Sequence, residues 1–218
     1  MATAIDFAKY FIKKGLDTNH NTYDGNMKLQ KLLFFADIIS LAESGEVLFS
    51  DPICAFSNGC VVESVRLRYK TDYSALHAES LEFVPSFTEA ESNIINLTIA
   101  MFGDASAKEL SDLNHSFAFW KTALQRSVQP NGYKDKHQAE VTPSEMMTEI
   151  DKIRTVIDAF RGGQCETENQ EIVNGVTFYY PDNLEMSDEV LEKLDRFSRE
   201  ADDEVYSVYL DGENLVIY

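Results

Sequence analysis

The stretch that decides the fold is MKLQKLLFFADIISLAESGEVLF, residues 27–49. Between Lys31 and Glu43 its only charged residue is Asp37, and leucine, isoleucine, phenylalanine and alanine residues occupy every side of a helix. A helix that is apolar nearly all round lies inside a protein rather than on its surface. The pattern therefore predicts a buried central helix that ends at Gly45, because glycine is the usual residue at a left-handed C-terminal cap.

Further helix signals stand on both sides of this segment. Residues 4–14 and 143–160 carry apolar side chains at helical spacing. A Ser or Thr stands three positions before a glutamate at Thr88 and at Ser106, which is the pattern of a capping box. Thr142 precedes a proline, as at the start of a helix. We expect the remaining helices over residues 61–70, 89–102, 106–115 and 117–125.

Two short extended pieces complete the first part of the chain. Asp51-Pro52 begins the first of them, and Ser57-Asn58-Gly59 is a turn signal that follows it. Residues 81–85 are expected to form a second short strand. Residues 1–161 therefore read as a mainly helical domain with a short β element.

The composition changes after Gly162. Residues 162–218 hold 15 acidic and 3 basic residues, a net charge of −12, whereas the whole chain of 218 residues carries −18. Residues 162–172 are polar and contain glycine, which predicts a linker. Residues 173–218 predict a β-α-β-β accessory domain whose last two strands meet at Asp211-Gly212. The fold class expected is α+β.

The amino-acid composition argues against several classes of function. A charge of −18 argues against direct nucleic-acid binding, which needs clustered Lys and Arg. The three cysteines form no CxxC pair and their number is odd, so a disulfide framework is not expected. This is typical of a reducing compartment, and we expect a cytoplasmic protein. The longest apolar run, residues 32–39, is too short to span a membrane and contains a charge.

No motif of known catalytic chemistry occurs in the sequence. The four histidines show no metal-ligand spacing, and there is no Walker A loop, GxGxxG or GxSxG. Cys54 and Cys60 stand six residues apart across a turn, where small buried side chains are the simpler interpretation. We therefore expect no catalytic residue, no cofactor and no metal site, and predict that the protein is not an enzyme.

Four strings of the chain together resemble the SocA-like antitoxin domain, also called the Panacea domain, which is known too from the phage-associated protein GepA. Cys60 replaces a usual proline, and Arg66 replaces a usual tyrosine. The resemblance covers residues 5–161. The strings comprise the helix residues Leu29 to Ala36, then Gly45, Leu48 and Phe49, then Phe56, Gly59, Val61, Val62 and Val65, and last Leu110, Ser111 and Trp120.

The resemblance implies an antitoxin of a toxin–antitoxin system, which neutralises a cognate protein toxin by direct binding. Some relatives resemble adaptors that deliver a toxin to a AAA+ protease, so a proteolytic adaptor is one alternative. A phage anti-defence protein or DNA mimic is another, acting through the acidic C-terminal part, where Asp188, Glu192, Asp195 and Asp202 form a candidate row. The sequence leaves open whether the protein is a homodimer and whether its source is a bacterium or a phage.

Candidate partner-binding residues come from the strings that carry the resemblance. Asn58 and Gly59 are expected to hold the tight turn. The other candidates are expected on the polar side of the central helix and on the helix after the turn, and they are Lys28, Lys31, Arg66, Arg68 and Tyr69.

Overall fold

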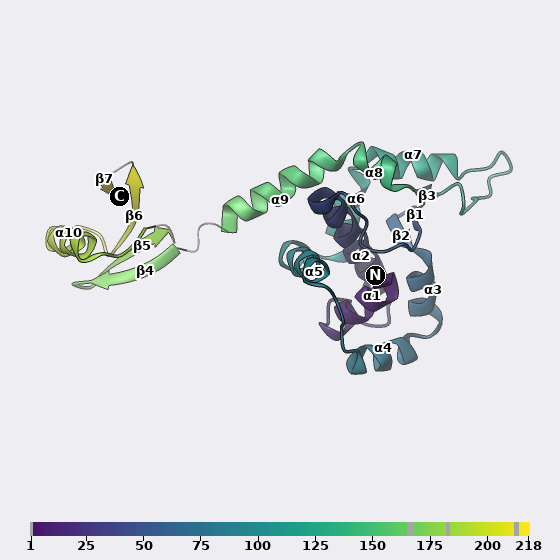
Figure 1. Ribbon diagram of the computed structural model, residues 1–218, viewed down its shortest axis with the longest axis horizontal. Coiled ribbons are helices and arrows are strands. Elements are labelled where there is room, and N and C mark those ends of the chain that lie inside the picture. Colours follow the sequence, from purple (N-terminus) through teal and green to yellow (C-terminus); the bar gives the residue numbers. More distant parts are fainter. Residues whose placement is uncertain (1, 165–167, 182–183, 212–213) are drawn as a thin grey trace. The chain divides into compact units, whose positions relative to one another are not determined.

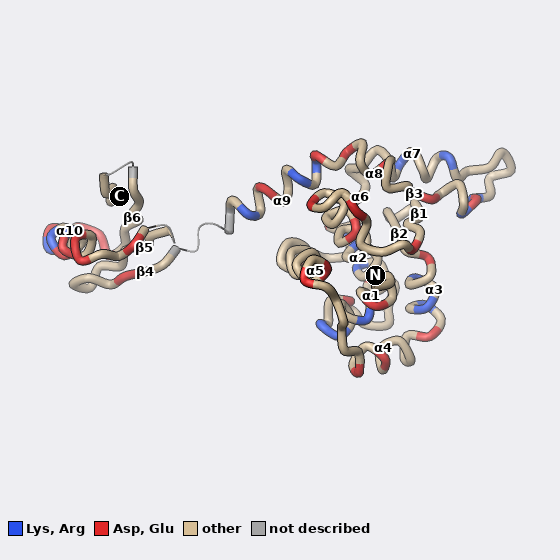
Figure 2. The backbone as a smooth tube through the Cα atoms, viewed as in Figure 1, with Lys and Arg blue, Asp and Glu red and all other residues tan. Residues whose placement is uncertain are grey.

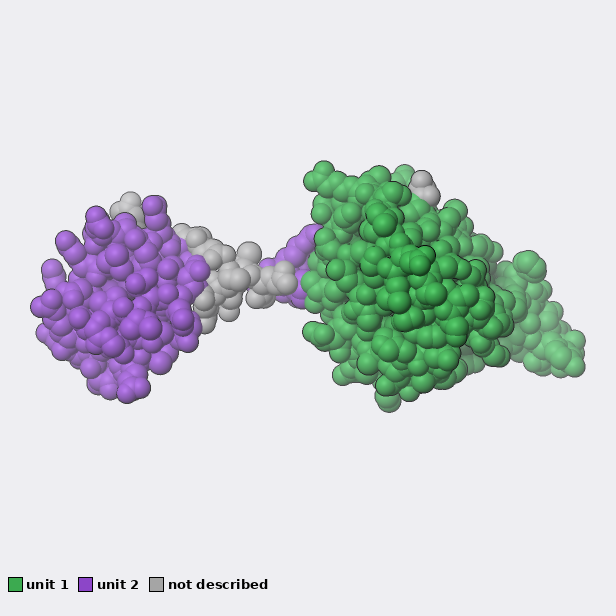
Figure 3. Space-filling view, turned by 90° about the horizontal axis from the view of Figure 1, so that it is seen from below, with its two compact units in different colours: residues 1–156 green, residues 157–218 purple. Residues whose placement is uncertain are grey.

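The computed structural model describes residues 2–164, 168–181, 184–211 and 214–218 (Figure 1). The chain divides into two compact units, residues 1–156 and 157–218, which Figure 3 colours separately. Within the described ranges, no helix has both the length and the apolar character needed to cross a bilayer.

Unit 1 is mainly helical. Its strands β1 (Ile53–Phe56), β2 (Gly59–Val62) and β3 (Glu140–Val141) form an antiparallel sheet in the order β2-β1-β3. The last helix, α9, crosses the boundary between the two units. The helices are α1 (Ala4–Lys13), α2 (Tyr23–Ser44), α3 (Glu63–Thr71), α4 (Tyr73–Glu82), α5 (Glu89–Phe102), α6 (Ala107–His115), α7 (Ala118–Arg126), α8 (Pro143–Met147) and α9 (Ile150–Gln164).

Helix α2 is the centre of unit 1, as its sequence predicts. Every residue from 28 to 42 is buried, and α1, α5, α6 and β2 pack around it. Gly45 has φ +77° and donates its N–H to Leu41 O, which confirms the expected C-cap. The helix begins at Tyr23, earlier than the apolar pattern suggests, because Thr22 Oγ1 accepts the N–H of Gly25 and caps a polar first turn.

Three local predictions in unit 1 are wrong. Residues 143–160 do not form one helix, because α8 ends at Met147 and α9 begins at Ile150. Val61 and Val62 do not begin a helix; they belong to β2 and pair with Cys54 and Ile53, where β-branched side chains suit a buried strand. Residues 81–85 form no strand, because α4 continues to Glu82 and the chain then leaves it as a loop.

The described residues of unit 2 form a four-stranded sheet, one complete helix and the last part of α9. The strand order is β4-β5-β6-β7, with β5 and β6 parallel and the outer pairs antiparallel. The fold class is therefore α+β, as expected. The elements are β4 (Glu168–Val173), β5 (Val176–Pro181), α10 (Asp188–Ser198), β6 (Val205–Asp211) and β7 (Asn214–Ile217).

The structure adds one strand, β4, to the predicted β-α-β-β order. Asn174 and Gly175 both have positive φ and form the two-residue turn that joins β4 to β5. Strand β4 lies at the edge of the sheet, and its sequence, ENQEIV, is mostly polar. This polar composition is the reason why the sequence alone predicts a linker here.

The expected linker, residues 162–172, is mostly regular structure where it is described. Helix α9 runs through Gly162 to Gln164, and β4 begins at Glu168, while residues 165–167 lie outside the described residues. Glycine weakens a helix by about 1 kcal/mol without necessarily ending it, which explains why Gly162 does not stop α9. The domain limits 1–161 and 173–218 remain predictions.

We predict different effects for alanine at two glycines. Gly45→Ala should lower the free energy of unfolding of unit 1 by about 1–2 kcal/mol, because L-residues are strained in the left-handed region. Urea unfolding followed by the fluorescence of Trp120, the chain's single tryptophan, measures this.

Gly162→Ala is the control. Its position is helical and a Cβ there would meet no atom within 4 Å, so the substitution should not destabilise the protein. Equal losses of stability from both substitutions would contradict the interpretation.

Candidate functional site

A half-open pocket of about 610 Å³ lies between the start of α2, the β1–β2 turn and α3. We call it the turn pocket. Its wall combines aromatic, aliphatic and polar side chains, and among the described residues it contains three cations and no carboxylate. The lining residues are Asn21, Thr22, Tyr23, Asn26, Met27, Gln30, Lys31, Phe56, Ser57, Asn58, Val61, Arg66, Tyr69 and Lys70.

Helices α6 and α7 hold the β1–β2 turn that forms one wall of the turn pocket. Ser111 Oγ donates a hydrogen bond to Asn58 O over 2.9 Å, and Trp120 Nε1 donates one to Phe56 O over 2.8 Å. These bonds give a structural reason for the serine and the tryptophan of the fourth string.

Asn114 holds the same turn from inside. Its Oδ1 accepts the N–H of Cys60 over 2.6 Å. Gly59 has φ +102°, and a Cβ at this position would overlap both Asn114 Oδ1 and the ammonium of Lys31. Only glycine therefore fits here, which supports the prediction that Gly59 holds the tight turn.

Two neighbouring residues of α2 attach this helix to β2. Gln30 Oε1 accepts the N–H of Val62 over 2.9 Å, and Lys31 Nζ donates to Cys60 O over 2.8 Å. Lys31 is only 1% exposed, and burial lowers its pKa from 10.5 to about 8. Gln30 also donates to Asn26, whose Nδ2 donates to Arg66 O, so this chain of amides reaches α3.

The thiols and the imidazole near the turn are poor candidates for nucleophilic chemistry. Burial raises the pKa of Cys60 to about 12 and also raises the pKa of Cys54. Burial, helped by the charge of Lys31, lowers the pKa of His115, which stacks on Trp120 with ring centres 4.0 Å apart. In the described part of the chain, no group of three His, Cys, Asp or Glu side chains could hold a metal ion.

Three of the predicted partner-binding residues, Lys28, Lys31 and Tyr69, are buried and bind groups inside unit 1 instead of presenting an exposed surface. Lys28 Nζ donates to Gly103 O over 2.8 Å, and Tyr69 OH donates to Asp17 Oδ2 over 2.8 Å. A buried polar group needs such a partner, which explains why these side chains turn inward. Lys31 and Tyr69 nevertheless line the turn pocket, whereas Lys28 does not.

Of the remaining candidates, Gly59 is also buried, whereas Asn58, Arg66 and Arg68 are exposed or partly exposed. Asn58 is exposed and donates to the hydroxyl of Tyr23. Arg66 pairs with Glu63 over 2.6 Å and lies over the ring of Phe56 at 5.4 Å, so it forms part of the pocket wall. Arg68 does not line the pocket and pairs with Glu79 of α4.

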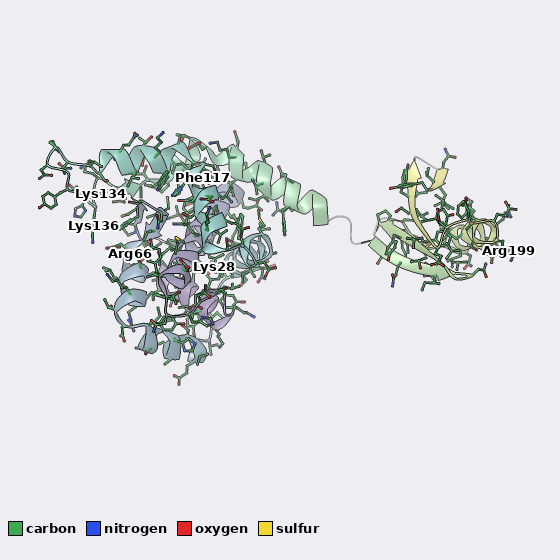
Figure 4. The ribbon with its side chains drawn as sticks, turned by 180° about the vertical axis from the view of Figure 1, so that it is seen from behind. Lys28, Arg66, Phe117, Lys134, Lys136 and Arg199 are labelled. Atoms are coloured by element: carbon green, nitrogen blue, oxygen red, sulfur yellow. The ribbon has the colours of Figure 1, made fainter. Side chains whose placement is uncertain are left out.

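Basic side chains from a distant loop gather next to Arg66. Lys136 Nζ binds Glu63, the same carboxylate that Arg66 binds, and Lys134 Nζ contacts Ser57 Oγ over 3.1 Å. Figure 4 labels Arg66, Lys134 and Lys136 on one side of unit 1. Sequence reasoning missed both lysines, because no local spacing indicates that residues 134–136 return to the β1–β2 turn.

Sequence reasoning also missed Tyr23 and Asn26, which line the turn pocket. A tyrosine that follows a run of turn-forming residues, in the stretch NHNTYDGN, was the available signal.

The acidic row proposed for a DNA mimic is not a continuous helix face. Helix α10 ends at Ser198, so Asp202 lies in the following loop, where its Oδ1 accepts the hydroxyl of Tyr206. Asp195 accepts hydrogen bonds from Asn174 and Arg199. Asp188, Glu192 and Asp202 are exposed, whereas Asp195 is partly buried.

Comparison with known proteins gives a family match. Residues 29–121 match the family model described as "Antitoxin SocA-like, Panacea domain". This match supports membership of this part of the chain in the SocA-like Panacea family, and the family suggests a role in a toxin–antitoxin system. No curated protein and no solved structure matches the chain.

We predict that Lys31 makes stability depend on pH above neutrality. Its folded pKa of about 8 lies below the unfolded value of 10.5, so the unfolded state binds more protons between these values. The free energy of unfolding should therefore rise with pH across this window, by up to roughly 3 kcal/mol from this group.

Lys31→Met should lack this rise. The measurement is the difference in the free energy of unfolding between the natural protein and the variant, at pH 7.5 and at pH 10. A difference that stays constant with pH would show that the ammonium is not desolvated.

Proposed function

We propose that this protein is an antitoxin, not an enzyme, that neutralises a cognate protein toxin in the cytoplasm by direct binding at the turn pocket. The observation that carries this proposal is the half-open turn pocket, whose turn is held by residues of the matched family segment. Gln30, Lys31, Ser111 and Trp120 all lie in that segment and all fix the turn or the strand beside it.

The residue types of the turn pocket suit recognition of a protein. Tyr23 is 69% exposed at its edge, and Arg66 lies over Phe56. Tyrosine and arginine are enriched among the residues that dominate protein–protein binding energy. Because the turn is fixed by internal hydrogen bonds, little conformational freedom would be lost when a partner binds.

The charge of the turn pocket also limits which part of a toxin can enter it. The whole chain is acidic, which would favour a basic toxin surface, yet the wall of the turn pocket holds Lys31, Arg66 and Lys70 and no described carboxylate. Glu63 neutralises Arg66 from just outside the wall. We therefore infer that the inserted toxin element is polar, aromatic or acidic, whereas basic toxin regions would face other surfaces.

The proteolytic adaptor is the alternative that the same test separates. An adaptor also binds the toxin, but neutralisation then requires a AAA+ protease and the toxin is lost from the cell. Occlusion needs no protease and leaves the toxin intact in a complex.

We predict that Tyr23→Ala weakens toxin binding by about 30-fold, corresponding to roughly 2 kcal/mol for truncation of an aromatic residue that contacts the partner. The toxin is defined as a protein that co-purifies with the full chain and arrests growth when produced alone. The measurements are its dissociation constant for each variant and the recovery of growth on co-expression.

Tyr133→Ala is the matched control, because Tyr133 is 75% exposed in the same unit and does not line the turn pocket. It should bind and rescue like the natural protein. Rescue that disappears in a host lacking the protease would favour the adaptor. Equal rescue by both variants would exclude the turn pocket as the toxin site.

A further inference from the structure

The cations around the turn pocket share few carboxylates. Lys136 Nζ and Arg66 Nε both bind the carboxylate of Glu63 over 2.6 Å. Lys134 Nζ has a neutral partner, Ser57 Oγ, over 3.1 Å. In Figure 2, basic positions of α3 and of the loop between α7 and β3 lie on the same side of unit 1. Positive charge therefore exceeds negative charge at this edge of the pocket, in a chain that is acidic overall.

Lys70 is a cation of the pocket wall without a protein partner. It is exposed and lines the turn pocket, and no hydrogen bond or ion pair from the described residues engages its ammonium. Lys70 follows Arg66 by four positions, so the two side chains lie on the same face of α3, where like charges repel. In a chain with 37 acidic and 19 basic residues, such a lysine is a group that a ligand can still bind.

Arg66 also keeps a donor for a ligand. Its guanidinium bonds to Glu63 through Nε and Nη2, while Nη1 makes no hydrogen bond to any residue that the structure describes. Because a guanidinium has five N–H donors in a fixed fork, Arg66 can bind a second acceptor without leaving Glu63. Lys70 and Nη1 of Arg66 are therefore two cationic donors, one helical turn apart, on the wall of one pocket.

Other carboxylates of this region do not bind these two donors. Asp17 is fully buried and accepts the hydroxyl of Tyr69, a residue of the pocket wall. Asp135 accepts the N–H of His137 within its own loop, and Asp24 is exposed but does not line the pocket. An acceptor for the two donors must therefore come from a ligand.

We propose that the toxin inserts an aspartate or glutamate side chain into the turn pocket, where its carboxylate binds Lys70 and Arg66. This inference rests on the proposed function and narrows it to an acidic element. A side chain suits the pocket better than a chain terminus, because capture of a terminal carboxylate uses free backbone N–H groups. At the β1–β2 turn, the N–H of Cys60 is already bonded to Asn114.

The remaining lining determines which residues accompany the carboxylate. Met27, Phe56 and Val61 also line the turn pocket and offer contacts to an aromatic or aliphatic neighbour of the acidic residue. Charge-assisted hydrogen bonds then orient the inserted element, while the buried apolar area adds affinity.

The first test needs no toxin. Two capped dipeptides, acetyl-Tyr-Glu-amide and acetyl-Tyr-Gln-amide, differ by one charge at nearly the same shape. Their binding to the full chain is followed by the NMR shifts of the backbone amides of Gly59 and Lys70. The acidic peptide should bind about fivefold more tightly, as an exposed ion pair allows, and Lys70→Gln should remove the difference.

Lys121→Gln is the matched control. Lys121 is an exposed lysine of α7 that does not line the turn pocket, so this variant should retain the preference for the acidic peptide. Equal binding of the two peptides by the natural chain, or binding of neither, would overturn the proposal. So would equal loss of the preference in both variants.

The second test uses the toxin defined above. Lys70→Glu should weaken toxin binding about tenfold, and a lysine in place of one acidic toxin residue should restore it, because this exchange recreates the ion pair. The ratio of the dissociation constants of Lys70→Gln and the natural chain should shrink from about 0.05 M to about 0.5 M NaCl, since salt screens the pair. Circular dichroism verifies that each variant is folded.

The inference and the proposed function fail in different ways. Toxin binding that Tyr23→Ala weakens and Lys70→Glu leaves unchanged would overturn the carboxylate but keep the turn pocket as the toxin site. Toxin binding that neither variant changes would overturn the proposed function, and with it the toxin as the source of the carboxylate. Failure of every acidic-to-lysine substitution in the toxin to rescue Lys70→Glu would contradict a side-chain carboxylate.

Discussion

The arrangement of the turn pocket depends on the bond from the Lys31 ammonium to Cys60 O. It places a charged group on a helix with no exposed side, and it joins that helix to the strand that follows the β1–β2 turn. Desolvation makes this ammonium costly, as its lowered pKa shows. The amide of Gln30 makes the parallel bond to Val62, so α2 and β2 are linked through polar groups inside an apolar core. Polar bonds fix direction and register, which apolar contacts alone do not.

Features that depend on residues close together in the sequence could be predicted, whereas contacts between residues far apart in the sequence could not. The central helix, its cap at Gly45 and the capping boxes of α5 and α6 depend on residues a few positions apart, and all of them are present. The sequence predicts Lys28 and Lys31 on a polar side of the helix, because the neighbouring residues do not indicate their hydrogen-bond partners. The carbonyl of Gly103 is 75 residues from Lys28, and that of Cys60 is 29 residues from Lys31.

The same distinction explains the candidate site. Asn58, Gly59 and Arg66 could be chosen from the turn signal and the strings around it, and they lie at or beside the turn pocket. The opposite wall comes from the loop before α2, and the neighbouring lysines come from the loop between α7 and β3. The sequence does not indicate these contacts, because the side chains of a loop do not alternate or repeat regularly as those of a strand or helix do. The strand β4 was missed for a related reason, because an edge strand can be polar on both faces.

The charge of the turn pocket differs from that of the whole chain. The pocket is lined by cations and aromatic rings in a chain that is acidic overall. Net charge alone would have assigned a basic partner to this surface. Long-range attraction mainly affects how fast proteins meet, while the groups at the contact decide what stays bound. The local composition of each surface, rather than the total of −18, is therefore the guide to its partner.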